Sequence, residues 1–464
     1  MNIVRINLKL YMFLVAMLFV FLPQVTSASA EPLDEVRQLI RDYYVDEVPE
    51  SVLSKGSVKE ITQYLDPHSV YMSAKEYQGF VDGIEQRIVG IGVVLEEDLK
   101  GIKVISVIPS GPADRAEIQS GDLITHVNGK SIVGKSIQTA ISLISGEEKT
   151  MVTLTIKRIG QAAPFTKKLT REEIMLPNVE YEMLGGNIAY IRLNSFALES
   201  TKEMDKAIRS LSGADGWIVD LRDNGGGYIT AAQDIAGFFP GVGNAFQLRE
   251  KNSKPKTYPS TFQSSKFNGL THVLINEYSA SASEMVSATV KEQKAATLYG
   301  QTSYGKGTMQ AMYGFDDGSV LKMTTARFYS PGGEPVDQVG VKPNVLTKVG
   351  KELEGSHRDQ LLMKLKGYKK LPELVNVPIT KKFTVEMNTK MNWKNIDKAA
   401  VQLIQLGEQE TEAVIEVVND KTITIVPKNP LMAGSRYILV IHPYYKNVQN
   451  KPMKQGIYVE VSVK

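Results

Sequence analysis

The spacing of apolar residues changes along the chain and divides it into segments of different structure. Over residues 31–84, apolar side chains recur at helical spacing and predict a helical region. These residues are Val36, Leu39, Ile40, Tyr43 and Tyr44. A turn is predicted at residues 66–69, and Ser73 with Glu76 predicts the start of another helix. A unit of this size seldom folds alone, so we expect it to pack on another domain or on a second subunit.

Residues 85–170 form a second segment, in which short strand-like stretches predict a β-rich domain. The predicted strands lie at residues 103–108, 121–124 and 151–156. Residues 136–145 have the periodicity of a helix, with Ile137 and Ile141 on its apolar face.

Residues 171–346 alternate between buried strands and amphipathic helices, which predicts an α/β core. The predicted strands lie at residues 187–193, 216–221 and 272–276, and the predicted helices at 204–211, 231–239 and 281–294. Ligands in such cores bind where strands end and helices begin. We therefore expect the functional residues in the loops that follow the strands.

The last part of the chain returns to β-structure. Residues 347–380 are charged and partly helical and predict a connector. Short strands separated by turn signals over residues 381–464 predict an immunoglobulin-like β-sandwich. We expect this sandwich to serve as a binding, spacing or adhesive unit, for example in attachment to a cell envelope. The predicted fold class is therefore a multidomain α+β protein.

The first thirty residues have the composition of a targeting segment. Arg5 and Lys9 precede an apolar run of 13 residues, 10–22, and Ala28-Ser29-Ala30 offers a cleavage site. This order predicts a signal peptide at residues 1–30, cleaved near Ala30. The alternative is an uncleaved membrane anchor at residues 10–22, although this run is short for a hydrocarbon core of roughly 30 Å. Both alternatives place the rest of the chain outside the cytoplasm.

Charge and composition exclude several classes of protein. The 54 basic and 51 acidic side chains give a net charge of +3, and removal of Arg5 and Lys9 would leave +1. Such a balance provides no basic surface for nucleic acid. The absence of cysteine excludes disulfides, thiolate metal sites and a cysteine nucleophile. With five histidines in 464 residues, we expect no metal site.

A run of small residues, Ser279-Ala280-Ser281-Ala282-Ser283, leads from a predicted strand into a predicted helix. It places Ser281 near a helix N-terminus, where unpaired N–H groups and the helix dipole would stabilise an oxyanion. The alternative is a capping box, because Ser281 and Glu284 have Ser-x-x-Glu spacing. On this segment alone, the cap is the favoured interpretation.

A second segment, residues 304–310, sets Lys306 between two glycines. Its presence favours Ser281 as a nucleophile over Ser281 as a helix cap. A serine nucleophile needs a base, and a neutral lysine can serve if burial lowers its pKa from about 10.4 to about 7–8. Met309 and Tyr304 are candidate walls of such a site, and Gln310 can orient the amine without adding charge. The alternative is a surface turn with a solvated lysine. His272 lies on an apolar strand, where a structural role is favoured over that of the base.

A third segment, residues 220–227, ends in three glycines that can turn backbone N–H groups toward a bound carbonyl. A plain loop is the alternative interpretation of this segment.

The order of strands and helix over residues 85–170 resembles a PDZ domain of the circularly permuted bacterial kind. The resemblance implies that Gly90, Ile91, Gly92 and Val93 form the loop that binds a peptide's terminal carboxylate. The peptide would add a strand to the sheet edge, with apolar pockets near Ile137 and Ile141.

The three chemical segments, behind this PDZ unit, resemble the C-terminal processing peptidases, also called tail-specific proteases. The resemblance covers residues 34–346 and includes Leu65-Asp66-Pro67-His68-Ser69. It implies a crotonase-like core in which Ser281 is the nucleophile, Lys306 the base and Gln310 the residue that orients it. It also implies oxyanion donors at Ala282 and at Gly226 or Gly227.

The chain departs from the family pattern at Ser303 and Tyr304, where Thr-Phe is common, and at Lys291-Glu292, where an Asp often follows. The resemblance implies an exported endopeptidase that needs no cofactor, binds apolar protein C-termini and pairs as a homodimer through its N-terminal helices. We also expect Arg171, at the junction of the two domains, to couple them. The rival hypotheses are a catalytically inactive peptide-binding scaffold and a surface adhesin.

Overall fold

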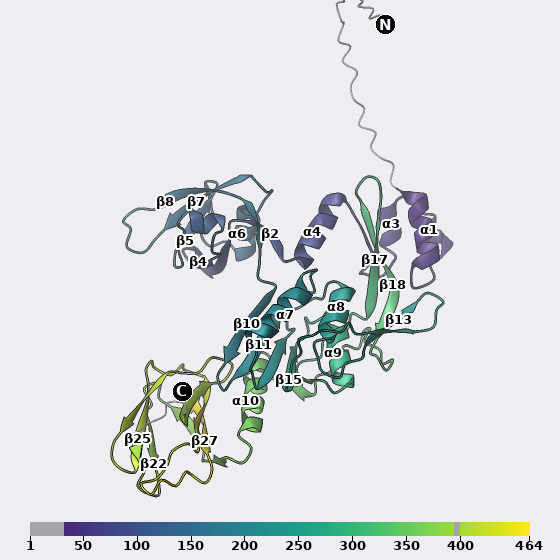
Figure 1. The fold of residues 1–464 in the computed structure, drawn as a ribbon. Coiled ribbons are helices and arrows are strands. Elements are labelled where there is room, and N and C mark those ends of the chain that lie inside the picture. Colours follow the sequence, from purple (N-terminus) through teal and green to yellow (C-terminus); the bar gives the residue numbers. More distant parts are fainter. Residues whose placement is uncertain (1–31, 394–399) are drawn as a thin grey trace, which may run out of the picture.

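The computed structural model describes residues 32–393 and 400–464, in four units that follow one another along the chain (Figure 1). The predicted signal peptide and the alternative anchor lie outside the described residues. Within the described part, no helix has the length and apolar character needed to cross a bilayer.

The N-terminal helices pack against a hairpin of the α/β core. They are α1 (Leu33–Tyr43), α2 (Glu50–Leu53), α3 (Val58–Thr62) and α4 (Ala74–Ile84), with β1 (Val70–Met72) between α3 and α4. Apolar residues of α1 to α3, among them Val36 and Ile61, share a core with Leu321 and Met323 of the hairpin. Ser73 and Glu76 form the predicted capping box at the start of α4. The helical unit therefore packs on another domain, which was one of the two expected arrangements.

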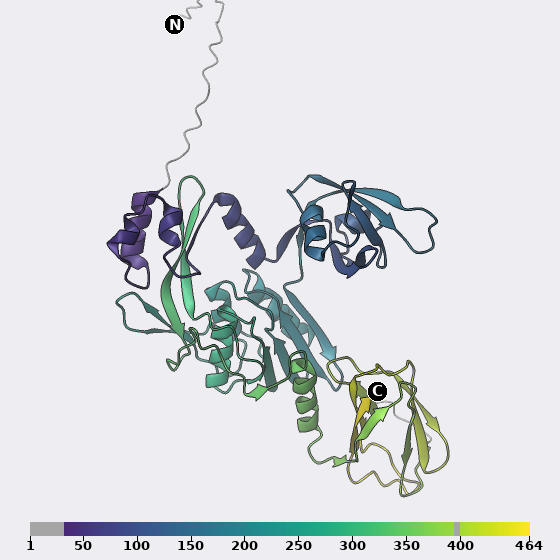
Figure 2. The ribbon, with the colours of Figure 1, turned by 180° about the vertical axis from the view of Figure 1, so that it is seen from behind.

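The PDZ-like unit is built around the sheet β3-β4-β5-β7-β8. Its strands are β3 (Val93–Asp98), β4 (Gly101–Val107), β5 (Leu123–Val127), β6 (Lys130–Ser131), β7 (Met151–Lys157) and β8 (Phe165–Thr170), and its helices are α5 (Pro112–Arg115) and α6 (Ile137–Ile144). A separate antiparallel pair, β2 (Arg87–Gly90) and β9 (Glu172–Met175), forms a stalk toward the core. Both views show the unit standing to one side of the molecule (Figures 1 and 2).

The core contains a six-stranded sheet in the order β10-β11-β12-β15-β16-β19. Its strands are β10 (Val179–Leu184), β11 (Ile188–Leu193), β12 (Gly216–Asp220), β15 (Leu270–Ile275), β16 (Thr297–Gly300) and β19 (Val345–Leu346). All neighbouring pairs are parallel except β10 with β11, as expected for an α/β core. One face is covered by α7 (Ser200–Ser210), α8 (Ile229–Ala236) and α9 (Ala282–Glu292).

A second sheet carries the hairpin that holds the N-terminal helices. Its order is β1-β18-β13-β14, with β17 also paired to β18. The strands are β13 (Asn244–Glu250), β14 (Lys256–Pro259), β17 (Thr308–Gly314) and β18 (Val320–Tyr329).

The C-terminal unit consists of two packed sheets, as predicted for a sandwich. One sheet has the order β20-β27-β26-β23, with β21 on β27, and the other has the order β22-β25-β24. The strands are β20 (Lys369–Lys370), β21 (Leu374–Val377), β22 (Phe383–Glu386), β23 (Val401–Gln405), β24 (Ala413–Val417), β25 (Thr422–Pro427), β26 (Arg436–Ile441) and β27 (Ile457–Val463). Two of them, β20 and β21, lie within the predicted connector and join the sandwich.

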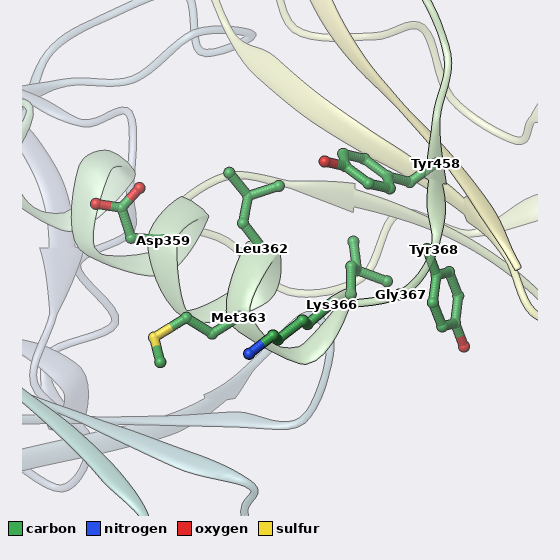
Figure 3. Close-up of a pocket in the computed structure, with 8 residues that line it drawn as sticks. Asp359, Leu362, Met363, Lys366, Gly367, Tyr368 and Tyr458 are labelled. Atoms are coloured by element: carbon green, nitrogen blue, oxygen red, sulfur yellow. The ribbon is translucent and has the colours of Figure 1, made fainter.

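The other face of the core sheet is covered by α10 (Glu352–Lys364), which also contacts the sandwich. Leu361 and Leu365 pack with Ile218 of the core sheet and with Ile404 and Ile438 of the sandwich. The connector thus forms part of a shared apolar core. The C-terminal end of α10 and the residues up to Tyr368 line a pocket of about 480 Å³, together with Tyr458 of the sandwich (Figure 3).

Candidate active site

Ser281 lies at the carboxyl end of β15, directly before α9. Its backbone has φ +55° and ψ −111°, a conformation that is uncommon for a residue with a side chain. Such a sharp turn from strand to helix presents a side chain above the sheet, as in the nucleophile elbow of α/β-hydrolases. The position agrees with the expectation that chemistry sits where strands end.

The carboxylate of Glu284 joins this turn to the lysine segment. It accepts hydrogen bonds from the N–H of Ser281 at 2.9 Å, the N–H of Gly305 at 2.6 Å and the N–H of Lys306 at 2.8 Å. It also accepts the hydroxyl of Ser303 at 2.6 Å. Burial raises the pKa of Glu284 above its usual range, against the effect of these bonds. The predicted cap residue therefore has a second role, because it holds both segments on one side chain.

Lys306 follows β16 in a loop and is largely withdrawn from water. Burial and the nearby charge of Lys322 lower the pKa of Lys306 to about 8, while Asp66 and Glu284 act in the opposite direction. Lys322 itself has a lowered pKa because of burial. Tyr304 is 60% exposed, so it does not form the wall predicted for the lysine, whereas Met309 packs on the core.

Gln310 lies on β17 next to an irregularity in the pairing of β17 with β18. Its amide nitrogen donates to the hydroxyls of Thr308 at 3.0 Å and Thr324 at 3.1 Å. Within the described part of the chain, no hydrogen bond joins Gln310 to Lys306. Both bonds use the amide nitrogen of Gln310, so its amide oxygen remains available to another donor.

The glycine loop lies against the serine turn. A Cβ on Gly226 would fall 2.9 Å from the Cβ of Ser281 and 3.1 Å from the nitrogen of Ala282, so the approach requires glycine. The N–H of Gly226 donates to Asn224 Oδ1 at 2.9 Å and is already used. Of the two glycines considered as oxyanion donors, Gly227 is therefore the better candidate, together with Ala282.

Asn224 connects the glycine loop to the serine turn and is fully buried. Its carbonyl accepts the N–H of Ala280 at 3.0 Å and the hydroxyl of Ser283 at 2.8 Å. Its side-chain nitrogen donates to the carbonyl of Leu193 at 2.8 Å. The three predicted segments are thus brought to one place by the side chain of Glu284 and the backbone carbonyl of Asn224, both buried.

Comparison with known proteins agrees with this arrangement. Residues 187–347 match peptidase family S41, residues 103–158 match the PDZ domain and residues 372–456 match the bacterial Ig-like domain. The carboxy-terminal processing protease CtpA of Bacillus subtilis is 34% identical over 319 residues, which cover 68% of this chain and 68% of that protein.

The chain belongs to peptidase family S41. A probable CtpA-like serine protease of Staphylococcus epidermidis is 34% identical over 327 residues, 68% of this chain and 65% of that protein. The solved structure of a photosystem II D1 C-terminal processing protease aligns with a TM-score of 0.45 and 24% identity, covering 68% of this chain and 92% of that one. The predicted family, the serine-type peptidase class and the multidomain fold class are confirmed.

Two features beside Lys306 could not be found from local sequence patterns. The turn with Asp66 and His68 is identified from the sequence only as a family motif. In the structure it lies near Lys306, because the pKa of His68 is lowered by burial and by the charge of Lys306. Lys322 was not singled out at all. Lys322 lies on β18, for which no strand was predicted, so no local signal marks it.

The PDZ residues predicted to bind peptide fall into two groups. Ile91 is 1% exposed, so its side chain belongs to the domain core, and only its backbone is available to a ligand. The loop has a left-handed Gly92 at φ +76°, and the carbonyls of Ile91 and Gly92 accept the N–H groups of Ala113 and Ile108. On α6, Ile137 is half-buried and Ile141 is 45% exposed.

Helix α6 and strand β3 of this PDZ domain contact each other. Gly90 ends β2 and Val93 begins β3, so the four loop residues lead directly into the strand beside α6. Val94 of β3 is 48% exposed and, like Ile141, is available to an apolar ligand.

Arg171 and His272 both have structural partners. Arg171 is buried and donates to the carbonyls of Leu143, Ile144 and Met151, all within the PDZ domain. It makes no hydrogen bond to the peptidase core in the part of the chain described, so the coupling role expected for it has no support. His272 bonds Ser356 of α10 at 3.0 Å, on the face opposite the serine, and burial lowers its pKa to about 4.

Proposed function

We propose that this S41 peptidase is an exported endopeptidase in which Ser281 is the nucleophile and Lys306 the general base. The observation that carries the proposal is the Glu284 carboxylate, which hydrogen-bonds the backbone N–H groups of both residues. A lysine with a pKa of about 8 is partly neutral at physiological pH, as a base must be.

The chemistry follows from these groups. The Ser281 hydroxyl gives its proton to Lys306 Nζ as Oγ bonds to the scissile carbonyl carbon. The N–H groups of Gly227 and Ala282 stabilise the oxyanion. Collapse of the tetrahedral adduct breaks the C–N bond, and the lysine proton passes to the leaving amine. Water then gives a proton to Lys306 as its oxygen bonds to the acyl carbon. The ester C–O bond breaks, and Lys306 passes the proton to Ser281 Oγ, which restores the free enzyme.

The PDZ domain supplies the substrate class in this proposal. A C-terminal carboxylate would bind the backbone of Gly90 to Val93, and the tail would lie beside β3 and α6. Val94, Ile137 and Ile141 give these two elements apolar side chains that are exposed or half-buried, so an apolar tail is the preferred ligand. The tail is then delivered to Ser281.

The context of the enzyme rests on the sequence and on the bacterial relatives. Residues 1–30 would direct export, and the C-terminal sandwich would hold the enzyme at the cell envelope. The N-terminal helices would pair two copies in a homodimer, as the family implies.

Incubation of the purified protein with an unfolded protein that ends in an apolar tail tests the proposal. Cleavage lost in both Ser281→Ala and Lys306→Ala, with peptide binding retained, is the expected result. Binding without cleavage by the unmodified enzyme would instead identify an inactive scaffold. A matched substrate that ends in two aspartates separates tail recognition from chemistry.

A further inference from the structure

The turn at residues 66–69 belongs to the N-terminal helical unit, yet it lies against β18 beside the site. Strand β1, which follows the turn, pairs with β18 so that Val70 lies opposite Lys322. The backbone N–H of Thr324 donates to the Ser69 hydroxyl at 3.0 Å, and the Thr324 hydroxyl bonds Asp66 Oδ1 at 3.0 Å. Two segments more than 250 residues apart are joined at this point.

The directions of these hydrogen bonds follow from the chemistry of the groups. A carboxylate accepts and does not donate, so the single proton of the Thr324 hydroxyl points to Asp66. The lone pairs of that hydroxyl remain for the amide nitrogen of Gln310, 3.1 Å away on the facing strand. This order, from Gln310 to Thr324 to Asp66, determines which end of the Gln310 amide is the nitrogen.

Asp66 is itself held in place. Its carboxylate also accepts the backbone N–H of His68 at 2.9 Å and the hydroxyl of Ser69 at 2.5 Å. Its own backbone N–H donates to the hydroxyl of the buried Tyr44 at 2.9 Å. The carboxylate is therefore a fixed acceptor rather than a mobile surface charge.

We propose that Asp66 is a positioning residue of the peptidase, which orients the Gln310 amide through Thr324 so that its oxygen remains free for the amine of Lys306. The inference rests on the Ser281–Lys306 mechanism proposed above. It makes the N-terminal helical unit part of the active site rather than an accessory.

Asp66 also affects the charge of the base directly. The charged and titratable groups that face Lys306 come from the turn, β18, α9 and the loop after β18, and they are Asp66, His68, Lys322, Glu284 and Asp337. Asp66 favours the protonated amine, so its neutralisation moves the acid limb of kcat/KM to lower pH. Loss of the Thr324 hydroxyl leaves that charge in place and does not move the limb.

The experiment compares pH profiles of kcat and KM for four variants, with melting temperatures measured in parallel. Thr324→Val is expected to lower kcat about tenfold, the worth of one hydrogen bond to a charged group, with KM and the acid limb unchanged. Thr324→Ser restores kcat. Asp66→Asn lowers kcat and moves the acid limb to lower pH.

The matched control is Thr325→Val, the same change one residue along β18, on the opposite face. Thr325 is buried and its hydroxyl has no hydrogen-bond partner in the described part of the chain, so this variant should match the unmodified enzyme. If Asp66→Asn does not fold, the comparison of Thr324→Val with Thr324→Ser still tests the proposal. Full kcat in Thr324→Val, while Ser281→Ala and Lys306→Ala are inactive, would overturn the role of Asp66 and leave the dyad intact. Activity in Ser281→Ala or Lys306→Ala would overturn the mechanism itself.

Discussion

The two sides of the central sheet bury charge in different ways. Beneath α10, the guanidinium of Arg222 lies 2.5 Å from Asp220 and 2.9 Å from Glu352, and all three side chains are largely buried. Beside α9, Lys306 forms no ion pair in the part of the chain that the structure describes, and its amine is withdrawn from water.

The comparison shows how the same burial serves structure on one side and chemistry on the other. A buried cation with two carboxylate partners stays charged, and the pKa of Arg222 is raised by those partners despite burial. A buried amine without a partner gives up its proton more easily, because desolvation favours the neutral form. Paired charge therefore marks the join between the core and α10, and unpaired charge marks the candidate base.

Replacement of Lys306, the unpaired cation, should have the largest effect on activity and should not lower the stability of the fold. Lys306→Met is expected to lower kcat by at least about 10²- to 10⁴-fold, the usual contribution of a general base. Because the unfolded chain binds the lysine proton up to about pH 10.4 and the folded chain only to about 8, the native protein loses stability as pH falls through this window.

Lys306→Met should therefore melt at or above the temperature of the unmodified protein at pH 7, and this advantage should shrink as pH rises toward 10.4. Calorimetry and peptide hydrolysis check the two effects. Lys202→Met, at an exposed lysine paired with Glu199, is the matched control. A large loss of stability in Lys306→Met would contradict the claim that the Lys306 amine is buried without a partner.

Glu284→Gln should have the next largest effect, because it replaces one of two acceptor oxygens by a donor. Oε2 accepts the N–H groups of Ser281 and Lys306, and Oε1 accepts Gly305 and Ser303, so either orientation sets an amide nitrogen against a backbone donor. We expect kcat to fall roughly 10- to 100-fold, equivalent to about 1–3 kcal/mol for one unsatisfied buried group. Steady-state kinetics would refute this role if kcat were unchanged.

On the opposite side, Glu352→Ala should affect stability and spare chemistry. Arg222 keeps Asp220 but loses its second carboxylate, and Gln301 loses an acceptor at 2.9 Å. The expected cost is about 2 kcal/mol in the free energy of unfolding, measured by urea titration. The kcat of the folded fraction should not change. A large drop in kcat without a loss of stability would show that the two sides are coupled.

The smallest expected effect is a displaced pH profile. Lys322 carries positive charge near Lys306 and lowers its pKa, so Lys322→Met should raise the pKa of Lys306 and move the acid limb of kcat/KM to higher pH. The plateau at high pH should be preserved. An unmoved limb would mean that burial alone sets the pKa.

Local sequence patterns predicted the elements and the three chemical segments. Period-3.6 patterns located helices α6 to α9, and strand patterns located β11, β12 and β15 of the core sheet, but no strand was predicted at β13, β14, β17 or β18. Small residues around Ser281 and Lys306 marked the turns where backbones approach each other. These features depend on neighbours along the chain, which is why they can be seen in one sequence.

Contacts between distant segments could not be predicted in this way. Asp66 and Thr324 meet across more than 250 residues, and the turn signal at residues 66–69 does not indicate which distant residue Asp66 contacts. The burial of α10 was missed for a related reason. Its sequence is charged, but Glu352 has a buried partner and His357 bonds the carbonyl of Gly185 at 2.8 Å, so polar residues occupy interior positions.

Titration of the Lys306 amine by NMR, in Ser281→Ala protein with labelled lysine side chains, tests the basis of the mechanism most directly. Lys306→Arg identifies the resonance. The account predicts a pKa of about 8, well below that of the other lysines. A value near the ordinary 10.4 would mean that the amine is protonated at neutral pH and cannot act as the base.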